Sequence, residues 1–409
     1  MPRNTRPGAG GHLALLALVV LIGINLRPFL AAPGPLLSDI VADTGMSYGS
    51  LAMLTLLPMF LMGVGAFISP RIQAVVGTRR GLLAALGLLL LGSLLRLVVA
   101  DGMSLILTAA LCGAGAAFIQ AAFPGIIKEK FPGNIAAVTG LYSGMIMGGG
   151  ALGARLMPVF VGIGCNWRQA LAWLALPVVV ALVAAFRVLS DTRVSRPDKA
   201  LVGQLLRRPR SWTLMAAFGL VNGGYSSMIA WLAPYYQSLG WSSADSAGLV
   251  AVMAICQAVS ALVLPLLARG RADRRPWLWL AVGMQAVGFA GLAFLPMAAP
   301  MFWAAICGAG LGGSFALAIV TALDHLPRPE QAGALAALMQ GGGFLLAAVP
   351  PFVMAMLHDG MGSFAGGWIM HLACVAVTAV LYMSFDPKRY ATAMRLPGFP
   401  AASPSVQFE

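Results

Sequence analysis

The first long apolar run of the chain carries three residues that a membrane span seldom contains. Asn25, Arg27 and Pro28 stand together within LALLALVVLIGINLRPFLAAPGPL. Arginine stays protonated and donates five N–H groups, so its chemistry is the binding of an anion or of carbonyl oxygens. Proline lacks a backbone donor and opens a helix locally. We predict that Arg27 faces a central cavity and binds a small anion; the alternative is a structural arginine tied to carbonyls.

Other polar and aromatic side chains interrupt later apolar runs and extend this candidate site. They are Gln120, Asn222, Tyr225, Trp231, Gln257 and Gln340. Asn222 and Tyr225 are three positions apart and therefore share a helix face. Each amide has an alternative role as a hydrogen bond between helices. Trp231 has an alternative role as an anchor at the membrane interface.

Acidic residues are absent from the middle of every apolar run. Asp39 and Asp324 come nearest, at the edges of their runs. Arg27 therefore has no internal counter-ion nearby in sequence, and a buried unpaired cation is costly. A negatively charged substrate would remove that cost. The same absence argues against ion coupling through a buried carboxylate. His371 is an alternative proton carrier, although a hydrogen bond to a neighbouring helix is the simpler role for it.

The composition places these residues in a membrane protein. Of the 409 residues, 59% are hydrophobic and 10% charged, whereas a soluble domain has about 25% charged residues. Runs of about 20 apolar residues are long enough to cross a bilayer as helices. We predict an all-α membrane protein with twelve transmembrane helices near 12–32, 48–69, 81–100, 103–124, 137–158, 169–189, 212–232, 247–268, 277–295, 299–321, 332–356 and 364–384.

The placement of charge predicts the orientation. With the N-terminus in the cytoplasm, nearly all of the 26 basic residues fall on the cytoplasmic side of the twelve spans. This distribution follows the positive-inside rule and puts both termini in the cytoplasm. The net charge of +13 therefore indicates topology and an attraction to anionic membrane lipid, not nucleic acid.

Internal repeats divide the chain into two halves. LCGAGAAF at 111–118 reappears as ICGAGLGGSF at 306–315, and SPRIQAVVGTRRGLL at 69–83 aligns with LPLLARGRADRRPWL at 264–278. We predict two pseudo-symmetric six-helix bundles, 1–190 and 211–386, joined by a cytoplasmic linker, 191–210, and followed by a tail, 387–409. Transporters built from such repeats bind substrate near the membrane midplane, between the halves.

Glycine spacing suggests where helices approach closely. Gly140, Gly144 and Gly148 repeat every fourth residue, as do Gly149 and Gly153, and residues 341–343 are all glycine. Small residues at this spacing let helix backbones pack tightly. We expect sliding or packing faces between the halves, with static packing as an equal explanation.

Sequence motifs give the chain a resemblance to the major facilitator superfamily. Its signature loop, G-x-x-x-D-R-x-G-R-R, survives in part as Gly77, Arg79 and Arg80, with Ala74 and Val75 in place of the acid and base. The second copy is closer to the signature. The stretches GINLRPFL, GLVNGGYSSMIAWLAPYY, CGAGLGGSFALAIVTALDH and LMQGGGFLLAA resemble the cyanate permease branch of this superfamily.

The resemblance implies a major facilitator fold in a bacterial inner membrane and transport by alternating access. In that superfamily spans 1, 4, 7 and 10 line the cavity, which favours Asn25, Arg27, Gln120, Asn222 and Tyr225 as substrate ligands. It also implies a gating or conformational role for charged residues near the cytoplasmic ends of spans. These are Arg79, Arg80, Asp273, Arg274 and Asp324.

The predicted function is secondary transport of a small anion, with cyanate expected. The alternative is export of small aromatic compounds such as nitroimidazoles, with Tyr225 and Trp231 as stacking surfaces. The sequence contains no nucleotide-binding loop, no HExxH motif and no acid pair inside a span, so we expect no enzyme activity, cofactor or metal. We expect a monomer. Direction of transport and coupling ion stay open.

Overall fold

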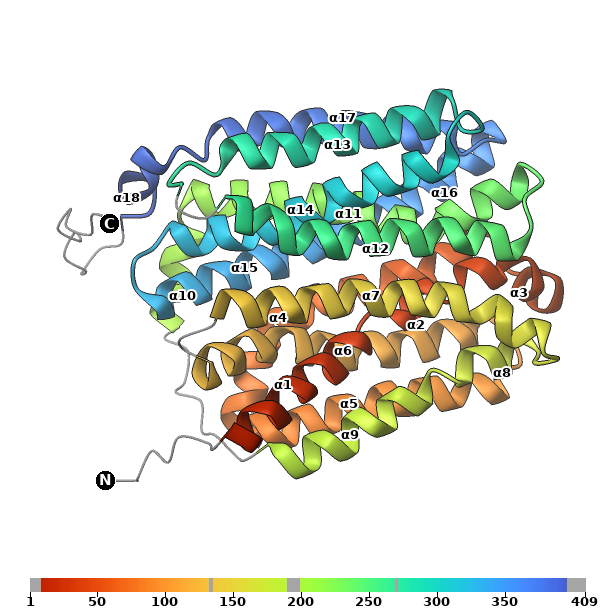
Figure 1. Cartoon of the computed structure of the whole chain (residues 1–409), viewed down its shortest axis with the longest axis horizontal. Coiled ribbons are helices and arrows are strands. Elements are labelled where there is room, and N and C mark those ends of the chain that lie inside the picture. The colour runs from red at the N-terminus through yellow and green to blue at the C-terminus, as the bar shows by residue number, and fades with distance from the viewer. Residues whose placement is uncertain (1–8, 132–134, 190–198, 269–270, 396–409) are drawn as a thin grey trace.

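The computed structural model describes residues 9–131, 135–189, 199–268 and 271–395, and these form helices that run along one common axis (Figure 1). In the first half the helices are α1 Ala9–Ile24, α2 Pro28–Ala31, α3 Leu37–Thr44, α4 Tyr48–Val76, α5 Thr78–Leu95, α6 Gly102–Lys130, α7 Ile135–Gly162, α8 Trp167–Ala172 and α9 Ala175–Val188, with 3-10 turns η1 Gly34–Leu36 and η2 Arg96–Val98.

The second half repeats this pattern of long helices. They are α10 Lys199–Leu206, α11 Pro209–Ser238, α12 Ser243–Leu267, α13 Arg275–Phe294, α14 Pro300–Asp324, α15 Pro329–Ala347, α16 Val349–Met361 and α17 Ala365–Met383, followed by η3 Pro387–Arg389 and α18 Tyr390–Ala393. Figure 1 shows α1–α9 gathered on one side of the molecule and α11–α17 on the other. We call its two ends the α10 end and the α3 end; the charge distribution predicts that the α10 end is cytoplasmic.

Eleven of the twelve predicted spans have a counterpart among the candidate membrane spans of the described chain. Eleven stretches are long and apolar enough to cross a membrane by length and composition. The remaining position is α11, the predicted seventh span, which has 30 residues and is buried along most of its length. Asn222, Tyr225 and neighbouring serines make α11 less apolar than the other spans, because it packs among helices and exposes little surface to lipid.

The first span is longer than predicted and is broken. It extends from His12 to Thr44 instead of ending at Ala32. The helix stops at Ile24, and α2 begins only at Pro28. Pro28 has no N–H to donate to the Ile24 carbonyl, which is the physical reason for the break predicted from the sequence. Arg27 therefore lies in non-helical backbone near the middle of a span.

The most extensive contacts between the two halves are those of α7 with α12 and of α4 with α15, and α4 also contacts α16. A Cβ at Gly140 of α7 would lie 2.9 Å from Leu262 of α12. A Cβ at Gly341 of α15 would lie 2.8 Å from the Phe67 ring of α4. These glycines therefore do line the contacts between halves, as their spacing predicted, and no larger residue fits there without movement of a neighbour.

Other glycines of α7 face the broken span within their own half. A Cβ at Gly149 would lie 2.1 Å from the Ile24 carbonyl oxygen, and a Cβ at Gly153 would lie 2.7 Å from Pro28 Cα. Both contacts are with backbone, which has little freedom to retreat. This glycine pair thus serves the break in the first span and not the contact between halves.

The glycine run 148–150 allows a test of this packing with one type of substitution. We expect Gly149→Ala to destabilise the protein by about 1–3 kcal/mol, because the added methyl group overlaps the Ile24 carbonyl. Gly148→Ala is the matched control, since a Cβ there meets nothing within 4 Å. Thermal unfolding in detergent should show a lower Tm for the first variant only; equal Tm values would contradict the proposed contact.

Candidate functional site

A cavity of about 260 Å³ lies between the two halves. The first half contributes α4, α6 and α7, and the second half contributes α14 and α15. It extends from Phe344 and Ile146 near the middle of the molecule to Leu323 and Gly333 at the α10 end. Most of its lining is apolar, and its polar lining residues are Gln120, Tyr142, Ser143 and Gln340.

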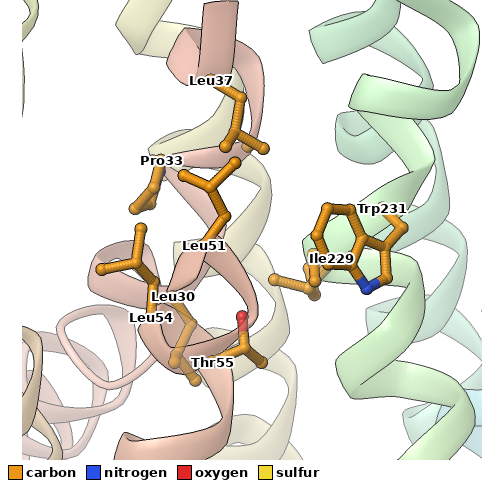
Figure 2. Close-up of a pocket in the computed structure, with 10 residues that line it drawn as sticks. Leu30, Pro33, Leu37, Leu51, Leu54, Thr55, Ile229 and Trp231 are labelled. Atoms are coloured by element: carbon orange, nitrogen blue, oxygen red, sulfur yellow. The ribbon is translucent and has the colours of Figure 1, made fainter. Parts of the chain in front are cut away.

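The opposite end of the interface between halves is closed. A pocket between α4 and α11 at the α3 end has a volume of about 10 Å³, which is room for about one water molecule. Figure 2 shows Leu51 and Thr55 on one wall of this pocket and Ile229 and Trp231 on the other. The Trp231 ring also contacts those of Tyr48 and Phe364, at centroid distances of 5.9 and 5.6 Å. This conformation is therefore open to the α10 end.

Arg27 lies at the point where the two halves meet, and its side chain has no solvent exposure. Its Nη1 donates to the Met59 sulfur at 3.7 Å. Its Cζ lies 4.5 Å from the centre of the Tyr225 ring and 6.0 Å from that of Phe344. The Nε and Nη2 atoms have no hydrogen-bond partner among the described residues, and no salt bridge to Arg27 forms among them. Its neighbours are thus aromatic rings and a thioether, not a carboxylate.

Side chains of the first half donate hydrogen bonds to two carbonyls of the broken span, those of Leu21 and Phe29. Asn25 Nδ2 donates to the Leu21 carbonyl at 2.7 Å and to the Pro177 carbonyl at 3.1 Å. Arg96, which is fully buried, donates to the Phe29 carbonyl at 3.3 Å; residue 33 is proline and supplies no N–H to it. Asn25 therefore points toward α9, away from Arg27, and is occupied with backbone.

The remaining predicted ligands divide into those that line the cavity and those that do not. Gln120 and Gln340 line it, and Gln120 Oε1 is buried without a hydrogen-bond partner among the described residues. Asn222 donates to the Phe218 carbonyl of its own helix at 2.8 Å. Trp231 donates to the Pro351 carbonyl at 2.8 Å in the closed α3 end. Gln257 is buried in α12 and does not line the cavity.

Three aromatic residues line the cavity and were not among the sequence candidates: Tyr142, Phe315 and Phe344. Phe344 lines the cavity, and its ring centre lies 6.0 Å from Arg27 Cζ. Tyr142 lines the same region, and its hydroxyl has no partner among the described residues. A glycine pattern in the sequence marks two of them: Tyr142 stands between Gly140 and Gly144, and Phe344 directly follows the glycine run 341–343.

His371, the alternative proton carrier, lies outside the cavity lining, and so does His325. His371 stacks on Phe289 with ring centroids 5.0 Å apart, and neither ring nitrogen has a hydrogen-bond partner among the described residues. The expected bond from His371 to a neighbouring helix is therefore not formed. His325 stacks on Tyr390 at 3.8 Å, at the α10 end.

The charged residues predicted to act in gating form ion pairs within the second half. Arg275 makes a bidentate contact with Asp273, with N···O distances of 2.9 and 2.7 Å. Arg274 pairs with Asp324 at 3.0 Å. The first contact lies within the α12–α13 connection, and the second links that connection to the end of α14. In this conformation neither contact bridges the two halves.

The corresponding loop of the first half is held differently. Arg79 donates to the Phe186 carbonyl at 2.9 Å, and Arg80 is exposed. The acid of the signature is replaced by Ala74, so no carboxylate of that loop is available to Arg79. A gating role for these five residues stays a prediction.

The sequence repeat and the two six-helix halves around a central cavity agree with comparisons to known proteins. A family model described as Major Facilitator Superfamily matches residues 13–351. The chain belongs to the major facilitator superfamily. It is a multi-pass membrane transporter and not an enzyme, and the predicted helical fold is confirmed.

Two relatives show which branch of the superfamily the chain resembles. The chain is 40% identical over 377 residues to the cyanate transport protein CynX of Escherichia coli (strain K12), covering 92% of this chain and 98% of that protein. It is 27% identical over 388 residues to the 2-nitroimidazole transporter of the same organism, covering 94% and 97%. The resemblance to this branch is therefore confirmed.

A solved structure shows the same fold at low sequence identity. The D-xylose-proton symporter superposes with a TM-score of 0.75 at 14% identity, covering 91% of this chain and 98% of that one. At this identity the likeness concerns the helix arrangement alone.

The Asp273–Arg275 pair leads to a prediction about pH. The hydrogen bonds from Arg275 hold the pKa of Asp273 below its usual range. A lowered native pKa stabilises the folded state above the unfolded pKa of about 3.9, and this contribution is lost as the pH falls through the native value. We expect Asp273→Asn to cost less than about 1 kcal/mol at pH 7, because the pair is partly exposed.

The Tm difference between wild type and Asp273→Asn in detergent should therefore be small at pH 7, begin to shrink near pH 4, and vanish once the pH is below the lowered native pKa of Asp273. Asp245→Asn, which removes a carboxylate at the other end of the molecule, is the control for a general loss of charge. A difference that grows as the pH falls below 4 would contradict the assignment.

Proposed function

We propose that the chain transports a small anion, with cyanate as the expected substrate, and that Arg27 is the anion-binding residue. The observation that carries this proposal is a fully buried guanidinium with two unpartnered nitrogens and no carboxylate partner among the described residues. An arginine at the centre of a span costs about 2.5–3.5 kcal/mol on insertion scales. A bound anion offsets that cost, whereas a neutral ligand does not.

The position of Arg27 also suits alternating access. The residue belongs to the first half, while Tyr225 and Phe344, whose rings lie beside its guanidinium, belong to the second half. An anion held by Arg27 therefore contacts both halves and can favour one arrangement of them over the other. Its influence is limited to the difference between its affinities for the two arrangements.

The path to Arg27 leads through the cavity at the α10 end. Gln120 and Gln340 offer amide hydrogens along this path, and Tyr142 and Ser143 offer hydroxyl groups. We propose that these four residues hydrogen-bond the anion along the path, and that the rings of Tyr225 and Phe344 form the walls of the site itself. The identity of 40% with a protein named for cyanate transport supports the choice of substrate.

A second candidate function is transport of small aromatic compounds such as nitroimidazoles. The apolar lining and the volume of about 260 Å³ favour it, because a three-atom anion needs neither. The 27% identity with a protein named 2-nitroimidazole transporter supports it as well. In this case Arg27 is a structural residue, and aromatic side chains such as Tyr225 bind the substrate by stacking.

The first test is uptake of labelled cyanate into proteoliposomes, with and without pH and voltage gradients, beside a labelled nitroimidazole. We expect saturable cyanate uptake in the wild type. In Arg27→Gln we expect roughly 10–100-fold lower kcat/KM, which corresponds to the loss of hydrogen bonds from a charged donor.

Arg155→Gln is the matched control, because it removes an exposed arginine of the same half and should leave uptake unchanged. Detergent extraction and gel filtration verify that each variant is inserted and folded. Nitroimidazole uptake without cyanate uptake, or full cyanate uptake in Arg27→Gln, would replace the proposal by the second candidate.

A further inference from the structure

The three nitrogens of the Arg27 guanidinium are not equally occupied. Nη1 is directed at the Met59 sulfur at 3.7 Å. Nε and Nη2 are buried and have no hydrogen-bond partner among the described residues. In a guanidinium these two nitrogens lie on the same edge and point their N–H bonds in parallel. The free part of Arg27 is therefore a two-pronged donor and not a point charge.

The surroundings of Arg27 restrict the direction from which a ligand reaches this edge. The Tyr225 ring lies 4.5 Å from Cζ, and the Phe344 ring lies 6.0 Å from it. Because the Tyr225 ring covers one face of the guanidinium, a ligand can approach its edge but not that face. A ligand must then lie close to the plane of the group.

A gap beside Arg27 exists because residue 150 is glycine. A Cβ at Gly150 would lie 3.5 Å from Arg27 Cβ and 3.9 Å from the Tyr225 hydroxyl, which are ordinary contact distances. One methyl group would therefore fit there without displacing a neighbour. Phe344 lines the larger cavity and lies 6.0 Å from Arg27 Cζ, so a ligand that enters from the cavity reaches Arg27 past this ring.

We infer that the free edge of Arg27 binds a small planar oxyanion, of the formate or nitrate class, through two parallel N–H···O hydrogen bonds. Two coplanar oxygens on one central atom match the spacing and direction of the two donors. A linear anion carries its terminal lone pairs along its axis and matches only one donor at a time. This inference rests on the proposed role of Arg27 and extends the substrate class beyond cyanate.

The test compares anions of equal charge but different shape on the purified full-length protein. Sodium formate and sodium nitrate are planar, and sodium azide is linear. Dissociation constants come from the concentration dependence of the Tm in detergent, because a ligand of the native state raises the Tm. We expect formate or nitrate to bind at least about fivefold more tightly than azide, since two charge-assisted hydrogen bonds replace one.

Substitution of Arg27 separates shape recognition from charge. Arg27→Lys keeps the positive charge but loses the paired donors, so the preference for planar anions should fall to within about twofold. Arg27→Gln should lose the binding of both kinds of anion. Azide binding as tight as nitrate binding in the wild type, or an unchanged planar preference in Arg27→Lys, would overturn the inference.

The glycine run 148–150 supplies a matched pair that tests the location. Gly150→Ala should weaken nitrate binding, because its methyl group occupies the gap beside Arg27. Gly148→Ala adds the same group in open space and should leave binding unchanged. Equal nitrate affinity in both variants would overturn the assignment of the gap as the anion site.

The outcomes also distinguish this inference from the proposed function. Nitrate and formate binding that depends on Arg27, without cyanate uptake, would support the inference and refute cyanate as the substrate. Cyanate uptake that depends on Arg27, together with tight azide binding, would support the proposed function and refute the planar preference. Absence of all anion binding would refute both.

Discussion

The guanidinium of Arg27 is a full positive charge near the middle of a membrane span, and the described residues supply it with no carboxylate. Its contacts are a sulfur atom and two aromatic rings, which stabilise a cation weakly compared with water or an anion. Such a group persists only where a gain elsewhere offsets its desolvation. In a transporter, that gain can come from a ligand that carries the opposite charge. The ligand then relieves the desolvation free energy of the buried cation, and this relief adds to the binding affinity.

The helix break around Arg27 depends on which groups hydrogen-bond the backbone carbonyls that it exposes. Pro28 and Pro33 leave the carbonyls of Ile24 and Phe29 without their helical donors, and inside a membrane free backbone groups are costly. Arg96 donates to the Phe29 carbonyl, and Asn25 takes the Leu21 carbonyl. The glycines of α7 let its backbone approach the break directly. A polar site in the middle of the bilayer is thus built from one irregular segment and from neighbours that satisfy it.

The two halves share a fold but differ in how they hold charge. Among the described residues, the two fully buried arginines, Arg27 and Arg96, belong to the first half. The second half contributes aromatic rings to the site, and at the α10 end it contains the ion pairs of Asp273 and Asp324. If α11 is aligned with the first span at the offset of 195 seen in the repeats, Asn222 stands where Arg27 does, in a continuous helix. The site is therefore asymmetric although its frame is pseudo-symmetric.

The sequence by itself determined the membrane class, most of the spans, the repeat and Arg27 as an anomalous charge, because hydropathy, repeat spacing and the cost of a buried cation are properties of the local chain. It also indicated the break at Pro28. It did not determine which polar side chains reach the cavity. Asn25, Asn222 and Trp231 proved to be bonded to carbonyls, whereas Gln120 and Gln340 line the cavity beside Tyr142 and Phe344. The direction of a side chain depends on how each helix is rotated against its neighbours. That rotation is set by close packing between residues far apart in sequence, which only the tertiary structure decides.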